Sequence, residues 1–380
     1  MMKFKTLDNV DAKGKVSLVR VDFNSDIRNG KVILSDRLLG AIETIKELRK
    51  KGAKVVLIAH QGRPGSVDYL SLKQHASLLN KYIKLKFVND VIGDKAKREI
   101  IALKNGEVLL LDNVRSIKDE FFPDKKGNLL VKNLVPLIDF YVNDAFSVSH
   151  REQTSIVTFP KFVPSFIGRL MEKELEGADK LNLNNALLVL GGSKPEDDVL
   201  LVNSLSKNKV LANGLFGPYC LMKRGVKFGK ENKVLKNSLM NGKIVGNVEK
   251  RIVTPKDFGI YRKGKRIDIG LDNLPIVEEI FDIGPETIAL FSKEILKAKS
   301  VFFKGLSGLC HTNEFCIGTR VLLKALEYSK AYSVVCGGHT TTALDRFNID
   351  RKKIGHASLA GGALVHYLAG KKLPGLEALS

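Results

Sequence analysis

The chain has 380 residues, of which 44% are hydrophobic and 27% charged, values that are ordinary for a packed globular protein. Its 62 Lys and Arg residues against 41 Asp and Glu give a net charge of +21, but the basic residues are scattered and accompany no RNA- or DNA-binding motif, which argues against nucleic acid as a partner. The sequence shows no apolar run of the roughly 20 residues that cross a bilayer and no signal-peptide core, so we expect a cytoplasmic protein without a membrane partner.

Short apolar runs alternate with helical periodicity along most of the chain, which is typical of parallel sheets built from β-α-β units. A helix is predicted from Asp36, taken as its N-cap, to Gly52, with Leu38, Ile42, Ile45 and Leu48 on one face. Strands are predicted at 15–21, 55–59, 84–88, 108–111 and 140–142, and again at 186–190, 209–212, 300–303, 333–336 and 355–359. The length and this pattern together predict an α/β protein with two doubly wound, Rossmann-like domains.

A single amphipathic segment separates the two halves. Ile167, Met171, Leu175 and Ala178 recur at helical spacing beside acidic residues. We therefore expect a hinge helix over 165–181, between an N-terminal domain at 1–164 and a C-terminal domain at 182–365.

The four cysteines all lie in the second half, and no two of them form a C-x-x-C pair. A zinc site or a disulfide framework is therefore not predicted, and plain thiols are the expectation.

Polar and basic residues follow the predicted strands of the first half. Ligands of open parallel sheets bind at the carboxyl ends of the strands, and guanidinium groups suit phosphate and carboxylate. The residues at this edge predict a pocket for a small polyanion and are Asp22, Asn24, Arg37, His60, Arg63, Arg115, His150 and Arg151.

Glycines follow the predicted strands of the second half. Glycine lets backbone N–H groups approach phosphates closely, and a lysine nearby adds a positive charge. This edge predicts a nucleotide-phosphate site at Gly191-Gly192-Ser193-Lys194, Gly214, Lys304-Gly305, Gly337-Gly338-His339 and Gly361-Gly362. A polyanion site and a nucleotide site joined by a hinge are typical of a phosphotransferase that closes on its substrates.

Two motifs of other kinases occur without their context. Asp257-Phe258-Gly259 matches a protein-kinase metal triplet, but no V-A-I-K strand or G-x-G-x-x-G loop accompanies it. The spacing from Gly259 to Lys265 is that of a Walker A loop, but Arg266 stands where Ser or Thr is required. We interpret both as coincidences.

The same residues resemble the phosphoglycerate kinase family over almost the whole chain. The matching segments are Val19-Arg20-Val21-Asp22-Phe23-Asn24, His60-Gln61-Gly62-Arg63-Pro64, Asn113-Val114-Arg115, Asn143-Asp144-Ala145-Phe146, His150-Arg151, Leu190-Gly191-Gly192-Ser193-Lys194 and Asp282-Ile283-Gly284-Pro285. The resemblance implies direct, reversible phosphoryl transfer between 1,3-bisphosphoglycerate and Mg²⁺-ADP, giving 3-phosphoglycerate and ATP, by a monomer.

The resemblance also implies individual roles. Arg37 and Lys194 would act on the transferring group, and the basic residues of the first half would hold the phosphoglycerate. The implied nucleotide site adds Gly284 and Thr340 to the glycine loops and to Lys304. The C-terminal segment, 366–380, would pack back on the N-terminal domain.

Several positions depart from the common family pattern and look like its archaeal branch. Asp198 stands in place of the second lysine of L-G-G-A-K-x-x-x-K, Lys304 in place of an asparagine, and His339 in place of the metal-loop aspartate, so that no protein ligand for Mg²⁺ is predicted. We hypothesise that Lys304 reaches the nucleotide phosphates, the alternative being a solvent-facing lysine. Two other functions stay open, namely a kinase for another small acyl phosphate and a catalytically weakened paralogue.

Overall fold

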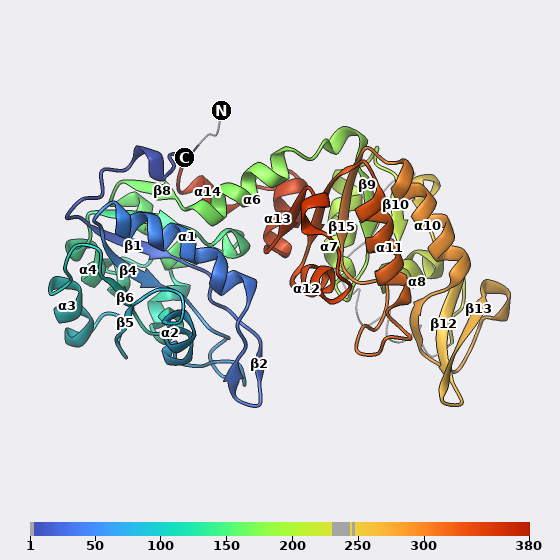
Figure 1. Cartoon of the computed structure of the whole chain (residues 1–380), viewed down its shortest axis with the longest axis horizontal. Coiled ribbons are helices and arrows are strands. Elements are labelled where there is room, and N and C mark those ends of the chain that lie inside the picture. Colours follow the sequence, from blue (N-terminus) through green and yellow to red (C-terminus); the bar gives the residue numbers. More distant parts are fainter. Residues whose placement is uncertain (1–3, 230–243, 245–247) are drawn as a thin grey trace. The chain divides into compact units, whose positions relative to one another are not determined.

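The computed structural model describes residues 4–229, 244 and 248–380, and the chain divides into two compact units (Figure 1). Unit 1 comprises Met1–Leu175 and Lys372–Ser380, and unit 2 comprises Glu176–Lys371. None of the described helices combines the length and apolarity that crossing a membrane demands.

Unit 1 is built on a six-stranded sheet in the order β5-β6-β4-β1-β7-β8, with every neighbouring pair parallel. The central strands are buried apolar runs, as expected where helices cover both faces. The strands are β1 (Val16–Arg20), β4 (Lys54–Ile58), β5 (Lys86–Phe87), β6 (Val108–Leu110), β7 (Phe140–Asn143) and β8 (Ser165–Ile167), beside a small hairpin of β2 (Ile27–Arg28) and β3 (Lys31–Val32).

Helices pack on both faces of this sheet, and residues that alternate along each strand enter two separate cores. The helix predicted from Asp36 is α1 (Asp36–Lys50), and its predicted apolar face is buried. Its N-cap is Ser35 and not Asp36, because the Ser35 hydroxyl accepts a hydrogen bond from Leu38 N at 3.4 Å. The other helices are α2 (Lys73–Leu79), α3 (Asp94–Ile101), α4 (Leu129–Leu134) and α5 (Thr154–Val157).

The last residues of the chain also belong to unit 1. Helix α14 (Pro374–Glu377) packs on α5, and Gly375 N donates to Ser149 O at 2.8 Å. The returning segment begins at Lys372 and not at 366, because α13 (Gly362–Leu368) packs on α7 (Pro195–Ser204) within unit 2.

Unit 2 contains a second parallel sheet, in the order β11-β10-β9-β15-β16-β17. Numbered along the chain this order is 3-2-1-4-5-6, which is the doubly wound arrangement, and it reverses direction between β9 and β15. The strands are β9 (Leu187–Leu190), β10 (Val210–Ala212), β11 (Ile252–Val253), β15 (Ser300–Lys304), β16 (Tyr332–Cys336) and β17 (His356–Ser358), and the remaining helices are α8 (Phe216–Lys223), α10 (Pro285–Lys297), α11 (Ile317–Tyr328) and α12 (Gly338–Arg346).

A three-stranded antiparallel sheet in unit 2 was not predicted. It is formed by β12 (Asp257–Arg262), β13 (Lys265–Gly270) and β14 (Ile280–Ile283). Both chance kinase motifs lie in its β12–β13 hairpin, which confirms that neither is a phosphate-binding loop.

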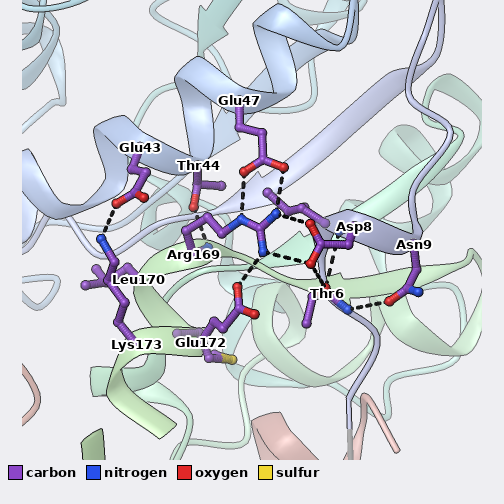
Figure 2. Close-up of polar contacts among 12 residues, drawn as sticks. Thr6, Asp8, Asn9, Glu43, Thr44, Glu47, Arg169, Leu170, Glu172 and Lys173 are labelled. Atoms are coloured by element: carbon purple, nitrogen blue, oxygen red, sulfur yellow. Dashed lines mark hydrogen bonds and ion pairs between the residues drawn. The ribbon is translucent and has the colours of Figure 1, made fainter. Parts of the chain in front are cut away.

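The predicted connecting helix is shorter than expected. Residues 165–167 form β8 at the edge of the first sheet, and the helix itself is α6 (Arg169–Asp179). Arg169 fixes its first turn to the rest of unit 1 through ion pairs with Glu47 of α1 and with Asp8, and it also pairs with Glu172 in the same turn of α6 (Figure 2). Its last turn is held in unit 2, where Tyr332 and Tyr367 donate hydrogen bonds to Gly177 O and to the Asp179 carboxylate.

The cysteine prediction was wrong for two of the four residues. Cys310 and Cys316 form a disulfide, because the loop between β15 and α11 turns back and brings their Cα atoms to 4.5 Å. Cys220 and Cys336 are free and buried, as expected.

Candidate active site

Loops at the carboxyl ends of β1, β4, β6 and β7 carry most of the predicted polyanion site of unit 1. These strands are parallel, so their carboxyl ends share one edge of the sheet. Cross-links between the loops hold them together: Asn24 Oδ1, after β1, accepts from Gly62 N, after β4, at 2.9 Å. Arg115, after β6, donates to Gly62 O.

Asp22 is the acidic member of this group and is almost fully buried. Its carboxylate lies 3.4 Å from Nη1 of Arg37, in the first turn of α1, and accepts a hydrogen bond from the Ser147 hydroxyl. Burial alone would raise the pKa of Asp22, but the charge of Arg37, the other positive groups nearby and the Ser147 hydrogen bond together outweigh burial and hold that pKa at about 2. Asp22 is therefore an anion that orients Arg37, and Arg37 remains 28% exposed.

His60 depends on a residue that the sequence did not single out. Arg20, the last residue of β1, is fully buried, and its Nη2 lies 2.9 Å from Nδ1 of His60. Arg20 also donates to Ser155 Oγ at 2.8 Å, and Ser155 donates to the buried Glu120 at 2.7 Å. The only sequence signal for this network was a charged residue inside an apolar strand.

Positive charge accumulates at this edge. Burial lowers the pKa of Arg115 to about 10, and the neighbouring charges of Arg151 and Arg20 add to that effect. Burial also lowers the pKa of Arg151. Arg63 is exposed and His150 is half-buried. Guanidinium groups this close repel one another unless an anion joins them, so the site is suited to a small molecule with several negative charges.

Three glycine loops of unit 2 meet at the point where the strand order reverses. Gly191 N, after β9, donates to Lys304 O at 2.8 Å, and Gly192 N donates to Leu306 O at 2.9 Å. Gly214, after β10, and Gly305, after β15, have φ of +51° and +83°, and a Cβ on either would meet backbone within 2.4 Å. We call this group the glycine cradle: Gly191, Gly192, Gly214 and Gly305.

Neighbouring predicted residues surround the cradle to different extents. Thr340, in the first turn of α12, accepts a hydrogen bond from Gly305 N at 3.1 Å and so connects that helix to the cradle. Ser193 and Lys194 are exposed after β9, and Gly338 and His339 are exposed after β16. Gly337 precedes α12, and Gly361 and Gly362 stand at the start of α13 with open space around their Cα atoms.

Gly284 lies in a different environment. It follows β14 of the antiparallel sheet and is buried against Asp257. The Asp257 carboxylate accepts from the N–H groups of Glu286 and Thr287, so it already caps the N-terminus of α10. A nucleotide-binding role for Gly284 stays a prediction, and these contacts are structural.

Lys304 is not the solvent-facing lysine of the alternative prediction. It ends β15, is only 8% exposed, and its Nζ lies 2.7 Å from Oδ1 of Asp198 in the first turn of α7. Two positions that depart from the common family pattern are therefore in contact.

A preformed metal site is not found among the residues that the structure describes, since no three His, Cys, Asp or Glu side chains there could hold one ion. Mg²⁺ binds hard oxygen ligands and commonly uses substrate phosphates with one or two carboxylates. Asp197, in the first turn of α7, is a partly exposed carboxylate of this kind.

The sequence profile of the phosphoglycerate kinase family matches residues 7–371. The chain belongs to the phosphoglycerate kinase family. It is 36% identical to the phosphoglycerate kinase of Methanothermus fervidus over 100% of this chain and 97% of that protein, and 38% identical to that of Sulfurisphaera tokodaii over 100% and 96%. The crystal structure of the Pyrococcus horikoshii phosphoglycerate kinase superposes with a TM-score of 0.90 at 33% identity, covering 99% of this chain and 98% of that one.

Membership of this family makes the chain a phosphotransferase. Its reaction is the reversible transfer of a phosphoryl group between 1,3-bisphosphoglycerate and ADP, which gives 3-phosphoglycerate and ATP. The two doubly wound sheets agree with the fold that the sequence predicted.

Proposed function

We propose that unit 1 binds the phosphoglycerate at its basic sheet edge and unit 2 binds the nucleotide at the glycine cradle. The buried Asp22–Arg37 contact among converging basic loops is the observation that carries this assignment, because it orients a guanidinium beside a site that requires an anion. The cradle supports the second half of the assignment, since glycines without Cβ atoms let a phosphate approach the backbone closely at the point where the sheet order reverses.

The reaction requires little covalent chemistry from the protein. Phosphoryl transfer is in line, and catalysis consists mostly of positioning and charge neutralisation. In this proposal Arg37 and Lys194 neutralise the transferring group, Asn24, His60, Arg63, Arg115, His150 and Arg151 hold the phosphoglycerate, and the exposed loops after β9 and β16 hold the nucleotide.

Mg²⁺ would enter with the nucleotide and be held by its phosphates. Asp197, in the first turn of α7, would be the protein carboxylate available to the ion. The ion would neutralise phosphate charge. Removal of Mg²⁺ by a chelator should abolish turnover, while phosphoglycerate should still bind to unit 1.

A coupled assay tests the function directly. The purified chain, given 3-phosphoglycerate and Mg²⁺-ATP, should form 1,3-bisphosphoglycerate, which a coupled dehydrogenase detects through NADH consumption. No turnover with 3-phosphoglycerate but turnover with another carboxylate would favour the other acyl phosphate kinase. If the folded protein turns over none of the carboxylates tested, the weakened paralogue would be favoured.

The remaining parts of the proposal concern the whole molecule. We expect a cytoplasmic monomer in which α6, fixed at one end in each unit, is the hinge. Because the transfer requires both ligands to meet, small-angle scattering should give a smaller radius of gyration for the ternary complex than for either binary complex. An unchanged radius would contradict the hinge.

A further inference from the structure

The ion pair between Lys304 and Asp198 is connected to the glycine cradle through the backbone of Lys304. Lys304 is the residue directly before Gly305, and its carbonyl oxygen accepts the hydrogen bond from Gly191 N. Its side chain points to the first turn of α7, where Nζ lies 2.7 Å from Asp198 Oδ1, 3.3 Å from Lys194 O and 4.0 Å from Asp197 Oδ2. The ammonium is thus held against the first turn of α7, beyond the carboxyl ends of β9 and β15, where the sheet order reverses and ligands of doubly wound sheets bind.

Stability does not explain why a charged pair should stand there. A buried ion pair rarely stabilises a fold more than well-packed apolar residues of the same volume, because both ions lose their hydration. Burial raises the pKa of Asp198 and the charge of Lys304 opposes that rise. Burial also lowers the pKa of Lys304, but the Asp198 carboxylate at 2.7 Å, together with Asp197, outweighs burial and raises the pKa of that lysine. The carboxylate therefore keeps the lysine charged.

The pair is also incompletely satisfied. Oδ2 of Asp198 is buried and has no hydrogen-bond partner among the residues that the structure describes. The ammonium has three N–H donors. One donates to Asp198 Oδ1 at 2.7 Å, one donates to Lys194 O over a longer distance of 3.3 Å, and the third has no hydrogen-bond partner among the described residues. The unused donor of the ammonium is the group that a phosphate oxygen can accept, whereas Oδ2 of Asp198 is an acceptor and could be completed only by a donor or a cation.

We propose that Lys304 delivers a positive charge from β15 to the phosphates of the bound nucleotide, and that Asp198 is a positioning residue that holds its ammonium at the cradle. The two departures from the family pattern are then one change, in which the lysine moves from helix to strand and an aspartate takes its place. This inference rests on the proposed nucleotide site of unit 2.

Two lysine variants test the delivered charge. Lys304→Asn should raise the Kd for Mg²⁺-ADP, measured by calorimetry on the full chain, and the KM for ATP by about tenfold. Because Lys304→Asn leaves Asp198 unpaired and endangers folding, the double variant Lys304→Met/Asp198→Leu replaces the whole pair by apolar side chains. It should fold with near wild-type stability and show the same tenfold loss. A double variant that binds Mg²⁺-ADP as wild type does would overturn the proposal.

A third variant tests the positioning role. Asp198→Asn removes a negative charge near the phosphates and retains the positive charge of Lys304, so the KM for ATP should not rise. The ammonium loses the partner that fixes its position, so kcat should fall about tenfold. A merely structural aspartate would change stability without this split. An unchanged kcat would remove Asp198 from the site.

Control measurements separate this inference from the proposed function. Lys209 stands before β10, at the opposite end of the sheet, and pairs with Glu294 at 2.6 Å, so Lys209→Met should leave the Kd for Mg²⁺-ADP unchanged. The KM for 3-phosphoglycerate should not move in any variant. If wild type has no kinase activity the proposed function fails, whereas calorimetry with Mg²⁺-ADP still decides the role of Lys304.

Discussion

Nη2 of Arg20 lies 2.9 Å from Nδ1 of His60, and both side chains are buried. A guanidinium can only donate hydrogen bonds, so Nδ1 must accept and the ring proton of neutral His60 must reside on Nε2. Burial, reinforced by the positive charge of Arg20, holds the pKa of His60 well below its ordinary value. If His60 contacts the phosphoglycerate as proposed, it offers an N–H donor and not a positive charge.

The first prediction concerns this histidine. Arg20→Gln removes one cause of the lowered pKa and leaves burial in place, so the pKa of His60 should rise. NMR of the imidazole resonances, assigned with His60→Gln, should show a titration midpoint of His60 well below that of an ordinary histidine in wild type and a midpoint at higher pH in the variant.

Arg98→Gln, an exposed arginine on α3, is the matched control and should not move that midpoint. The KM for 3-phosphoglycerate should become pH-dependent only in Arg20→Gln. A wild-type His60 that titrates near 6.5 would contradict the assigned tautomer.

The second prediction concerns Arg37. Its contact with Asp22 orients the guanidinium without burying it, as a group that meets a developing charge requires. Arg37→Ala should lower kcat by about 10³ or more, by analogy with arginine fingers. The unfolding midpoint should change little, and a kcat within a few-fold of wild type would remove Arg37 from the catalytic residues.

The sequence predicted the parts of the site that depend on strand ends. Parallel strands bring their carboxyl ends to one edge, so Asn24 and Gly62 could be placed together although they are 38 residues apart. The same reasoning located Gly192 and Gly305. The ten predicted strands, all in the two parallel sheets, and the buried face of α1 follow from hydrophobic periodicity, so the amino-acid sequence alone was sufficient to predict them.

The missed features depend on contacts that local pattern does not encode. The Arg20–His60 contact joins side chains 40 residues apart, and the Lys304–Asp198 pair joins side chains 106 residues apart. Taken alone, Arg20 and Lys304 are charged residues at the ends of strands, and Asp198 is an acidic residue in the first turn of a helix. The strands β12 and β13 are a different case, since Phe258 and Ile260, and then Ile267 and Ile269, do alternate with polar or small residues, and this signal was overlooked.

The third prediction concerns the acid sensitivity of the α6 anchor. Hydrogen bonds from Arg169 lower the pKa of both Glu47 and Asp8. Folded-state pKa values below those of the unfolded chain stabilise the fold above about pH 4.5 and stop doing so as the pH falls through the folded pKa. Arg169→Met should therefore lower the free energy of unfolding by about 1–2 kcal/mol at pH 7, a moderate value because the network is partly exposed.

Urea titrations of both proteins at pH 7 and pH 3 measure this effect, and the difference between them should shrink at pH 3. Arg262→Met removes a single exposed pair with Glu278, which water and salt screen, and should change the free energy of unfolding little at either pH. An Arg169 effect of equal size at both pH values would show that packing, and not charge, holds the helix.

The fourth prediction concerns the Cys310–Cys316 disulfide. It closes the turn of the loop that leads from the cradle to α11, and Arg346 of α12 donates hydrogen bonds to Cys310 O and Asn313 Oδ1 within that loop. Cross-linking a loop this short restricts the unfolded chain and should stabilise the fold by about 2 kcal/mol. A non-reducing digest should yield the linked peptide.

Reductant should lower the unfolding midpoint of wild type. It should also raise the KM for ATP, because the loop begins at Gly305, without changing the KM for 3-phosphoglycerate. The double variant Cys310→Ser/Cys316→Ser should behave as reduced wild type and should not respond to reductant. The digest shows whether reductant has broken the bond in wild type. If the bond is broken and the unfolding midpoint does not change, the disulfide contributes nothing to stability.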